Sequence, residues 1–366
     1  MVGYGLVVSL FLFLLAGYRN RIARLASSVT DRQVWALTGL TFLALLIAFA
    51  VVYPIANAGV VGGGSDADDA LNLAVSELLQ GRYPYYPETY LGNPISPLPG
   101  ALFLSIPFVL LGNGATQNFF WLLVFVLAMK SYLNNGRLAL LLLWLILSLS
   151  PAIPYQMMIG SDYTANTLYI LLFMLWLLRA VVQSELPGWQ KALPAIFLGI
   201  GLSSRANFLL ILPLIAAALV RVAGWRTAIQ TMGITGVAFA AVTLPFYLYD
   251  PAAFSPLHTH RDLSQFNVIL PYAGVVIPLV TGVIAGLLAI FRPANQDFNM
   301  LLKQCAIVLA FPVLCGIVLA TIWFGRLELA FATFGTFFLY FGAAGYWRDF
   351  WGNFSSPTSI AVDGVE

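Results

Sequence analysis

Three carboxylates fall within four positions of one loop. The segment GGGSDADDALNLAVSELLQGRYPYY at 62–86 carries Asp66, Asp68 and Asp69 in a chain in which 9% of residues are charged. A carboxylate can serve as a general base that accepts the proton of a substrate hydroxyl. Asp66 lies just after a run of three glycines and before the body of the expected helix, so its carboxylate could be aimed into a cleft and is a candidate for catalysis. Asp69 is a candidate substrate-binding residue, whereas Asp68 fits a first helical turn, which favours acids by about 0.3–1 kcal/mol each.

Arginines at three places are candidate ligands for a phosphate group, because the guanidinium fork pairs with phosphate oxygens. Arg205 is the first choice, since it interrupts an apolar run and has no basic neighbour; it could instead be a snorkelling end residue. Arg261 and Arg326 are the next choices, although Arg326 could simply pair with Glu328. Arg82, beside YPYY, is better explained as an interface anchor.

Four further residues are candidates for substrate binding. Asp162 opens an apolar run, where it could position an acceptor, help to bind a divalent cation (Mg²⁺ or Mn²⁺) or cap the helix. His258 and His260 could hydrogen-bond to hydroxyl or phosphate groups of a substrate, or be solvated residues of a polar loop. Tyr85 could stack on the face of a substrate ring, although tyrosines also form belts at membrane interfaces. Asp66 and Asp162 alone are too few ligands to require a metal.

The composition is that of an integral membrane protein. The 366 residues are 60% hydrophobic with a mean hydropathy of +0.88, whereas soluble domains are about half apolar and a quarter charged. We therefore expect an all-α, polytopic membrane protein with a single membrane domain over 1–366. The net charge of +2 does not indicate a nucleic-acid partner. Cys305 and Cys315 share one apolar run and are interpreted as packing residues.

About eleven transmembrane helices are expected, since a span needs roughly 20 apolar residues. The apolar runs are 2–17, 34–56, 98–133, 137–156, 163–182, 192–204, 207–221, 227–248, 268–291, 302–325 and 327–345. The run 98–133 is too long for one simple crossing and is broken by LGNGATQN at 111–118. It is either two short crossings or a half-inserted hairpin followed by one crossing.

The distribution of basic residues distinguishes one net crossing over 98–133 from two, because lysine and arginine are enriched in cytoplasmic connections. With one net crossing over 98–133, one face receives thirteen of the 17 basic residues: Arg19, Arg21, Arg24, Arg32, Lys130, Arg137, Arg179, Lys191, Arg221, Arg226, Arg292, Lys303 and Arg348. With two crossings the basic connections would be split between both faces. We therefore expect one net crossing, and the loop 57–97 then lies on the extracytoplasmic side.

This outer loop is expected to contain an amphipathic helix. Ser65 and Asp68 have the spacing of a capping box, and DADDALNLAVSELLQ would form about four turns that end before Gly81 and Pro84. Such a helix would lie in the membrane interface. The segment PISPLPG at 94–100 then leads into the next apolar run.

The order of these motifs resembles that of the GT-C glycosyltransferases, which are multi-span enzymes that use polyprenyl-phosphate sugars. The resemblance is carried by SD at 65–66, LLQGRYPYYP at 78–87, PISPLPG at 94–100, GSDY at 160–163 and GIGLSSRANFLLILPLI at 199–215. It covers about 34–215, and 227–345 would add further transmembrane helices. Arg205 stands where lysine is commoner in the family.

The resemblance implies a glycosyltransferase in which Asp66 is the general base and arginines hold the donor phosphate. The partners would be a polyprenyl-phosphate sugar, membrane lipids and a lipid, glycan or protein acceptor. Some members of the superfamily use a divalent cation and others do not. The compact size favours a bacterial plasma membrane, with the active site on the extracytoplasmic side.

Two other functions are compatible with a multi-span chain. A polysaccharide polymerase of the O-antigen type would act through outer arginines on a large late loop; the late loop 249–267 has nineteen residues, against forty-one for 57–97. A lipid or solute transporter would carry charges or prolines at the middle of several spans. Most charges here lie at run ends, which favours the transferase.

Overall fold

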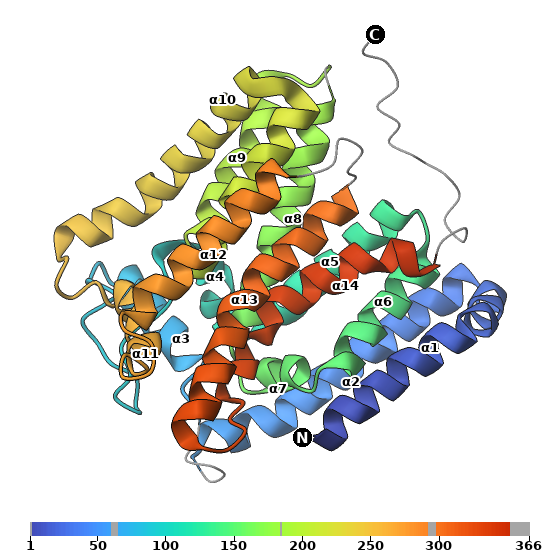
Figure 1. Cartoon of the computed structure of the whole chain (residues 1–366), viewed down its shortest axis with the longest axis horizontal. Coiled ribbons are helices and arrows are strands. Elements are labelled where there is room, and N and C mark those ends of the chain that lie inside the picture. The colour runs from blue at the N-terminus through green and yellow to red at the C-terminus, as the bar shows by residue number, and fades with distance from the viewer. Residues whose placement is uncertain (1, 60–64, 184, 292–297, 352–366) are drawn as a thin grey trace.

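The protein is a bundle of helices (Figure 1). The computed structural model describes residues 2–59, 65–183, 185–291 and 298–351. Within these ranges the regular elements are all helical, and the one pairing of extended backbone is an isolated bridge between Glu88 and Pro94. The expected all-α class is therefore confirmed.

The long helices follow the apolar runs. They are α1 (Val2–Ser28), α2 (Asp31–Asn57), α5 (Gln117–Leu133), α6 (Gly136–Leu149), α8 (Tyr163–Val182), α9 (Gly188–Leu202), α10 (Leu212–Tyr249), α12 (Ala273–Ile290), α13 (Phe298–Phe324) and α14 (Thr336–Trp351). Gly224, with φ 77°, interrupts α10, so this element contains two helical segments, as the separate runs 207–221 and 227–248 predicted.

Shorter helices complete the fold. They are α3 (Asp69–Leu79), α4 (Pro99–Leu110), α7 (Ala152–Met158) and α11 (Arg261–Ser264), with 3₁₀ turns at Gly114–Thr116, Ala206–Ile211, Ser255–His260 and Ala330–Gly335. Over the described residues, five helices are long and apolar enough to cross a membrane, or up to seven if each of two bent pairs is one span. The multi-pass character is thus supported, but the number eleven is not reached, because α9 and α14 are short and the runs 207–221 and 227–248 fall in one interrupted element.

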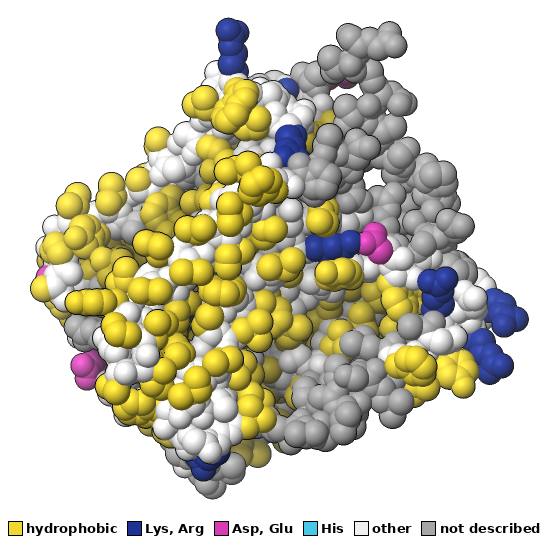
Figure 2. Space-filling model, in the orientation of Figure 1, with side chains coloured by type: hydrophobic (Ala, Val, Ile, Leu, Met, Phe, Trp, Pro, Cys, Tyr) yellow, Lys and Arg dark blue, Asp and Glu magenta, His cyan; other side chains and the backbone are white. Residues whose placement is uncertain are grey.

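Apolar side chains cover the middle of the molecule, and most of the lysine and arginine side chains seen in the same view lie along its top and right edges (Figure 2). Contacts of two basic residues show which helix ends lie together. Lys130 Nζ lies 4.4 Å from the ring centroid of Trp35, and Arg137 Nε donates to the Val29 carbonyl at 2.6 Å. The C-terminal end of α5 therefore lies beside the N-terminal end of α2, which is the basic end of the bundle.

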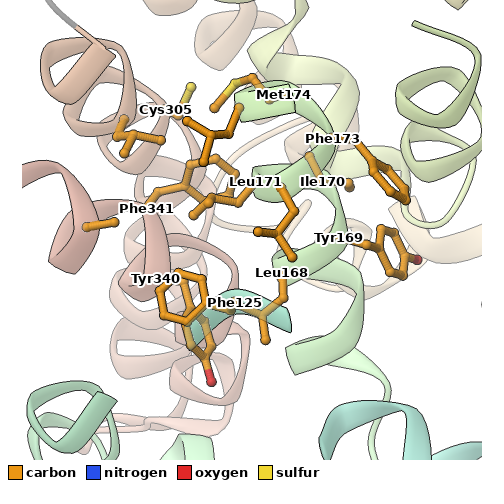
Figure 3. Close-up of a cluster of buried hydrophobic side chains, with 14 of the residues drawn as sticks. Phe125, Leu168, Tyr169, Ile170, Leu171, Phe173, Met174, Cys305, Tyr340 and Phe341 are labelled. Carbon is orange, nitrogen blue, oxygen red and sulfur yellow. The ribbon is translucent and has the colours of Figure 1, made fainter. Parts of the chain in front are cut away.

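The centre of the bundle is α8, most of which is buried. Its side chains Leu168, Leu171 and Met174 lie among residues of α5, α13 and α14 (Figure 3). Cys305 is buried in this cluster, and neither Cys305 nor Cys315 forms a disulfide. The interpretation of Cys305 as a packing residue is therefore confirmed.

The run 98–133 is bent by 102° between α4 and the segment that contains α5. The backbone N–H of Leu98 donates to the Ser204 carbonyl at 3.0 Å, and Asn113 Nδ2 donates to the Tyr53 hydroxyl at 2.7 Å. Both ends of α4 thus lie at the end of the bundle formed by the C-termini of α2 and α9, and α5 alone leads to the basic end. These contacts favour one net crossing.

The helix of the first long loop, α3, is shorter than expected. It begins at Asp69, and the side chain of Asp68, its N-cap residue, makes no capping hydrogen bond. Ser65 Oγ accepts only from the Ala67 N–H at 3.4 Å, so the expected capping box is wrong. The physical reason is that the Asp68 carboxylate turns inward toward α2. The helix ends at Leu79 as expected, and Gly81 has a positive φ of 72°.

Candidate functional site

A cavity of about 610 Å³ opens among the loops at the end of the bundle away from the basic residues. It collects side chains from five separate connections of the chain. The lining residues are Asp66, Ala67, Ala70, Thr89, Asn93, Pro94, Ser96, Gln156, Ile159, Ser161, Tyr163, Arg205, Ser255 and Thr333. Among them, Asp66 is the one carboxylate and Arg205 the one cation, and hydroxyl and amide groups make up much of the remaining wall.

Hydrogen bonds fix one of the two carboxylate oxygens of Asp66. Its Oδ2 accepts hydrogen bonds from Thr89 Oγ1 at 2.5 Å and from Asn93 Nδ2 at 2.8 Å. Its Oδ1 has no hydrogen-bond partner in the part of the chain that the structure describes. One carboxylate oxygen is thus fixed by the loop, and the other is left to accept a proton or a hydrogen bond from a ligand.

The turn at 88–94 supplies both of these donors. The Thr89 N–H donates to the Asn93 carbonyl at 2.9 Å, and the Asn93 N–H donates to Thr89 Oγ1 at 3.1 Å. Asp69 binds the same turn, since its Oδ2 accepts from the Tyr90 N–H at 3.1 Å. Asp66 and Asp69 therefore attach the second half of the loop to the start of α3, and Asp69 lies outside the cavity wall.

The third acid of the cluster, Asp68, is buried. It accepts hydrogen bonds from the Tyr53 hydroxyl and from Asn72 Nδ2, and Asn113 in turn contacts both Tyr53 and Asn72. Burial raises the pKa of the Asp68 carboxyl above its usual value. A helix-dipole role therefore does not account for Asp68, which joins α2, α3 and the α4–α5 turn beneath the loop that carries Asp66.

Arg205 reaches the cavity because the helix breaks there. The residue lies in extended backbone between α9 and the following 3₁₀ turn, with φ −146° and ψ 133°. Its side chain is only 14% exposed, so the snorkelling alternative does not describe it. Nη1 donates to Ser96 Oγ at 3.0 Å, Nη2 donates to Asp162 Oδ1 at 2.6 Å, and the Tyr163 ring centroid is 5.1 Å from Cζ.

Asp162 lies directly behind Arg205 and is 1% exposed. Its side chain does not cap α8. Instead, Oδ1 binds Arg205, and Oδ2 accepts from Asn166 Nδ2 at 2.9 Å. The Tyr169 hydroxyl donates to Asn166 Oδ1 at 2.6 Å, which fixes the amide. Asp162 therefore acts on the cavity through Arg205 rather than by bordering it.

The structure does not bring all the predicted site residues together. Arg326 has a 76% exposed side chain, lies 3.8 Å from Glu328 and does not border the cavity. Tyr85 is buried among Phe246 and Phe254, donates to the Pro97 carbonyl at 3.1 Å and has a pKa raised well above its usual value by burial. Their predicted roles in phosphate and sugar binding find no support in this placement. The side chains of Arg261, His258 and His260 lie outside the described residues.

Several cavity residues were not predicted from the sequence. They are Thr89, Asn93, Ser96, Gln156, Ser161, Tyr163, Ser255 and Thr333. Ser96 belongs to PISPLPG and Ser161 to GSDY, so the two motifs pointed to the correct loops without identifying these side chains. Single serines, threonines and amides in loops carry no spacing pattern that would have found the others.

The described residues contain no group of three or more His, Cys, Asp or Glu side chains that could hold a metal ion. A divalent cation thus stays a prediction. Chemically, the cavity offers a carboxylate with one oxygen that has no hydrogen-bond partner among the described residues, a guanidinium held by Ser96 and Asp162, and neutral hydrogen-bonding groups in the rest of the wall. The chain matches no protein-family model, no curated protein and no solved structure.

Proposed function

We propose that this chain is a membrane glycosyltransferase that moves a sugar from a polyprenyl-phosphate donor to a lipid, glycan or protein acceptor. The observation that carries the proposal is that Asp66 and Arg205 border one polar cavity. A general base and a cation for the leaving phosphate are the two groups that this reaction requires. Their common cavity also supports the resemblance to the GT-C glycosyltransferases.

In the proposed reaction, the acceptor hydroxyl oxygen attacks the anomeric carbon of the donor sugar. The bond between that carbon and the phosphate oxygen breaks, and its electron pair stays on the departing prenyl phosphate. Asp66 Oδ1 takes the proton of the acceptor hydroxyl. General base catalysis of this kind contributes about 10²- to 10⁴-fold to the rate.

Arg205 would meet the negative charge that develops on the leaving phosphate. Arginine has five N–H donors, and the contacts with Ser96 and Asp162 leave others available for phosphate oxygens. Because these contacts hold the guanidinium in place before the ligand arrives, little reorganisation is needed during the reaction. Preorganised charge of this kind is usually the largest catalytic contribution.

The proposed location is the extracytoplasmic face of a bacterial plasma membrane. Basic side chains gather along the top and right edges of the view in Figure 2, and Lys130 and Arg137 lie at the end of the bundle formed by the start of α2 and the end of α5. Basic residues favour the cytoplasmic side. In this orientation α3 would lie in the outer interface, and the prenyl chain of the donor would stay in the bilayer while its phosphate reaches the cavity.

The test is sugar transfer from synthetic prenyl-phosphate sugars to membranes that contain the protein. Mass spectrometry of the lipid extract should detect free prenyl phosphate, and its formation should require the protein. Arg205→Ala should lower kcat/KM for the donor, because it removes the cation that would bind the donor phosphate and stabilise its developing charge. Arg82→Ala is the matched control, since Arg82 is exposed and pairs with Glu77 outside the cavity. No release of prenyl phosphate with any donor sugar would contradict the proposal.

A further inference from the structure

The ion pair between Asp162 and Arg205 is buried and immobilised. The side chains are 2% and 14% exposed, and Nη2 lies 2.6 Å from Oδ1. Both oxygens of Asp162 are engaged, one by Arg205 and the other by Asn166. Breaking a buried pair leaves an uncompensated charge, which is strongly unfavourable. We therefore expect the pair to persist when an anion enters the cavity.

A persistent pair changes the charge that an anionic ligand meets. Arg205 and Asp66 are the charged groups among the described residues of the cavity wall, and Asp162 lies immediately behind Arg205. Together these three side chains leave one negative charge in excess. A ligand with one negative charge can satisfy Arg205, whereas each additional charge is also repelled by Asp162 and Asp66.

We propose that Asp162 determines the charge selectivity of the site, so that the cavity accepts a singly charged phosphodiester in preference to a doubly charged diphosphate. Asp162 does so as a positioning residue: it fixes the guanidinium of Arg205 at the wall and compensates part of its charge. The inference rests on the proposed function for the identity of the anion as a lipid phosphate ester.

The experiment compares two probes that have the same farnesyl chain and the same terminal methyl ester and differ by one phosphoryl unit. These are farnesyl methyl phosphate, with one negative charge, and farnesyl diphosphate methylated at its terminal phosphate, with two. Their Kd values are measured with the purified full chain in nanodiscs. The wild-type protein should bind the singly charged probe more tightly. Asp162→Asn should shift the ratio of the two Kd values toward the doubly charged probe by on the order of tenfold, as expected for removal of a charge a few ångströms away in a partly buried site.

Two further variants separate this charge effect from a loss of structure. Asp162→Glu keeps the charge and should retain the wild-type ratio. Ser96→Asp adds a carboxylate where Arg205 Nη1 already donates, and it should move the ratio in the direction opposite to Asp162→Asn. Ser96→Asp also tests the proposal if Asp162→Asn does not fold. Glu77→Gln removes a partly buried carboxylate that pairs with Arg82 outside the cavity and should leave the ratio unchanged.

Equal Kd values for the two probes in the wild-type protein would overturn the inference. An unchanged ratio in a folded Asp162→Asn variant would also overturn it, and if that variant does not fold, an unchanged ratio in Ser96→Asp would overturn it. The readout is binding and not transfer. Selectivity set by Asp162 in a protein that transfers no sugar would thus contradict only the proposed function, and sugar transfer with no effect of Asp162 on the ratio would contradict only this inference.

Discussion

The Thr89 hydroxyl donates a 2.5 Å hydrogen bond to Oδ2 of Asp66. With Asn93 on the same oxygen, this contact turns the carboxylate so that Oδ1 is left for a ligand. The turn at 88–94 therefore orients the side chain of the proposed general base, although Thr89 comes more than twenty residues after Asp66 in the chain.

Thr89→Val should remove this support while preserving the size and β-branching of the side chain. We expect the kcat for sugar transfer to fall by roughly tenfold to a hundredfold, because small misplacements of a catalytic group have effects of that size. The KM for the donor should change little, since Thr89 is not proposed to bind the phosphate. Initial rates in membranes with matched protein abundance provide the measurement, and a kcat equal to that of the wild type would show that the hydrogen bond does not orient Asp66.

Asp68 should make the stability of the protein depend on pH. Because burial raises the pKa of this carboxyl in the folded state, the folded protein holds the proton more tightly than the unfolded chain. Stability should then fall as the pH rises from the unfolded value of about 3.9 through the folded pKa. Asp68→Asn should lack this part of the pH dependence. Thermal unfolding of both proteins in detergent from pH 4 to pH 7 measures the difference, and parallel curves would contradict it.

Gly160→Ala should destabilise the packing around Asp68 and Tyr53, beneath the loop that carries Asp66. Gly160 has φ 84°, and a Cβ atom there would lie 2.8 Å from the Asp68 Cβ and 3.0 Å from Tyr53 Cε2. We expect a loss of about 1–3 kcal/mol from the backbone conformation alone. The matched control is Gly233→Ala in α10, where no atom other than the neighbouring backbone of the same helix lies within 4 Å of the added Cβ. If the two variants unfold at the same temperature, the close packing at Gly160 does not support the site.

The turn between α4 and α5 should be accessible from the same side of the membrane as Asp66. Leu111, at this turn, is 84% exposed, so Leu111→Cys in a background with Cys305 and Cys315 replaced by Ala should react with a membrane-impermeant maleimide added to intact cells. Ser28→Cys, at the basic end, should react only after permeabilisation. Labelling of Leu111→Cys only in permeabilised cells would indicate two crossings within 98–133.

The sequence was most informative where a helix is fixed by its own apolar run. The run 163–182 corresponds to α8 (Tyr163–Val182) without a shift, because hydrophobicity and flanking polar residues both mark its ends. The motifs SD and GSDY and the isolated Arg205 likewise pointed to the loops that form the cavity. These are local properties, and they can be predicted without knowledge of the packing.

Roles that depend on a partner from another element were not predictable. Asp68 fits a helix N-terminus, but the Tyr53 hydroxyl of α2 draws its carboxylate inward. Tyr85 lies in an aromatic loop sequence, yet packing against Phe246 of α10 buries it. Asp162 has the position of a helix cap, and only the break at Arg205 provides its ion-pair partner. Each of these outcomes follows from the pairing of distant loops.

The most direct test of the central claim is sugar transfer by Asp66→Asn, compared with Glu88→Gln, which changes an exposed carboxylate of the same loop outside the cavity wall. At equal protein abundance, the account predicts that Asp66→Asn lowers the rate by about 10²- to 10⁴-fold, while Glu88→Gln retains the wild-type rate. Transfer at the wild-type rate by Asp66→Asn would contradict the assignment of Asp66 as the general base.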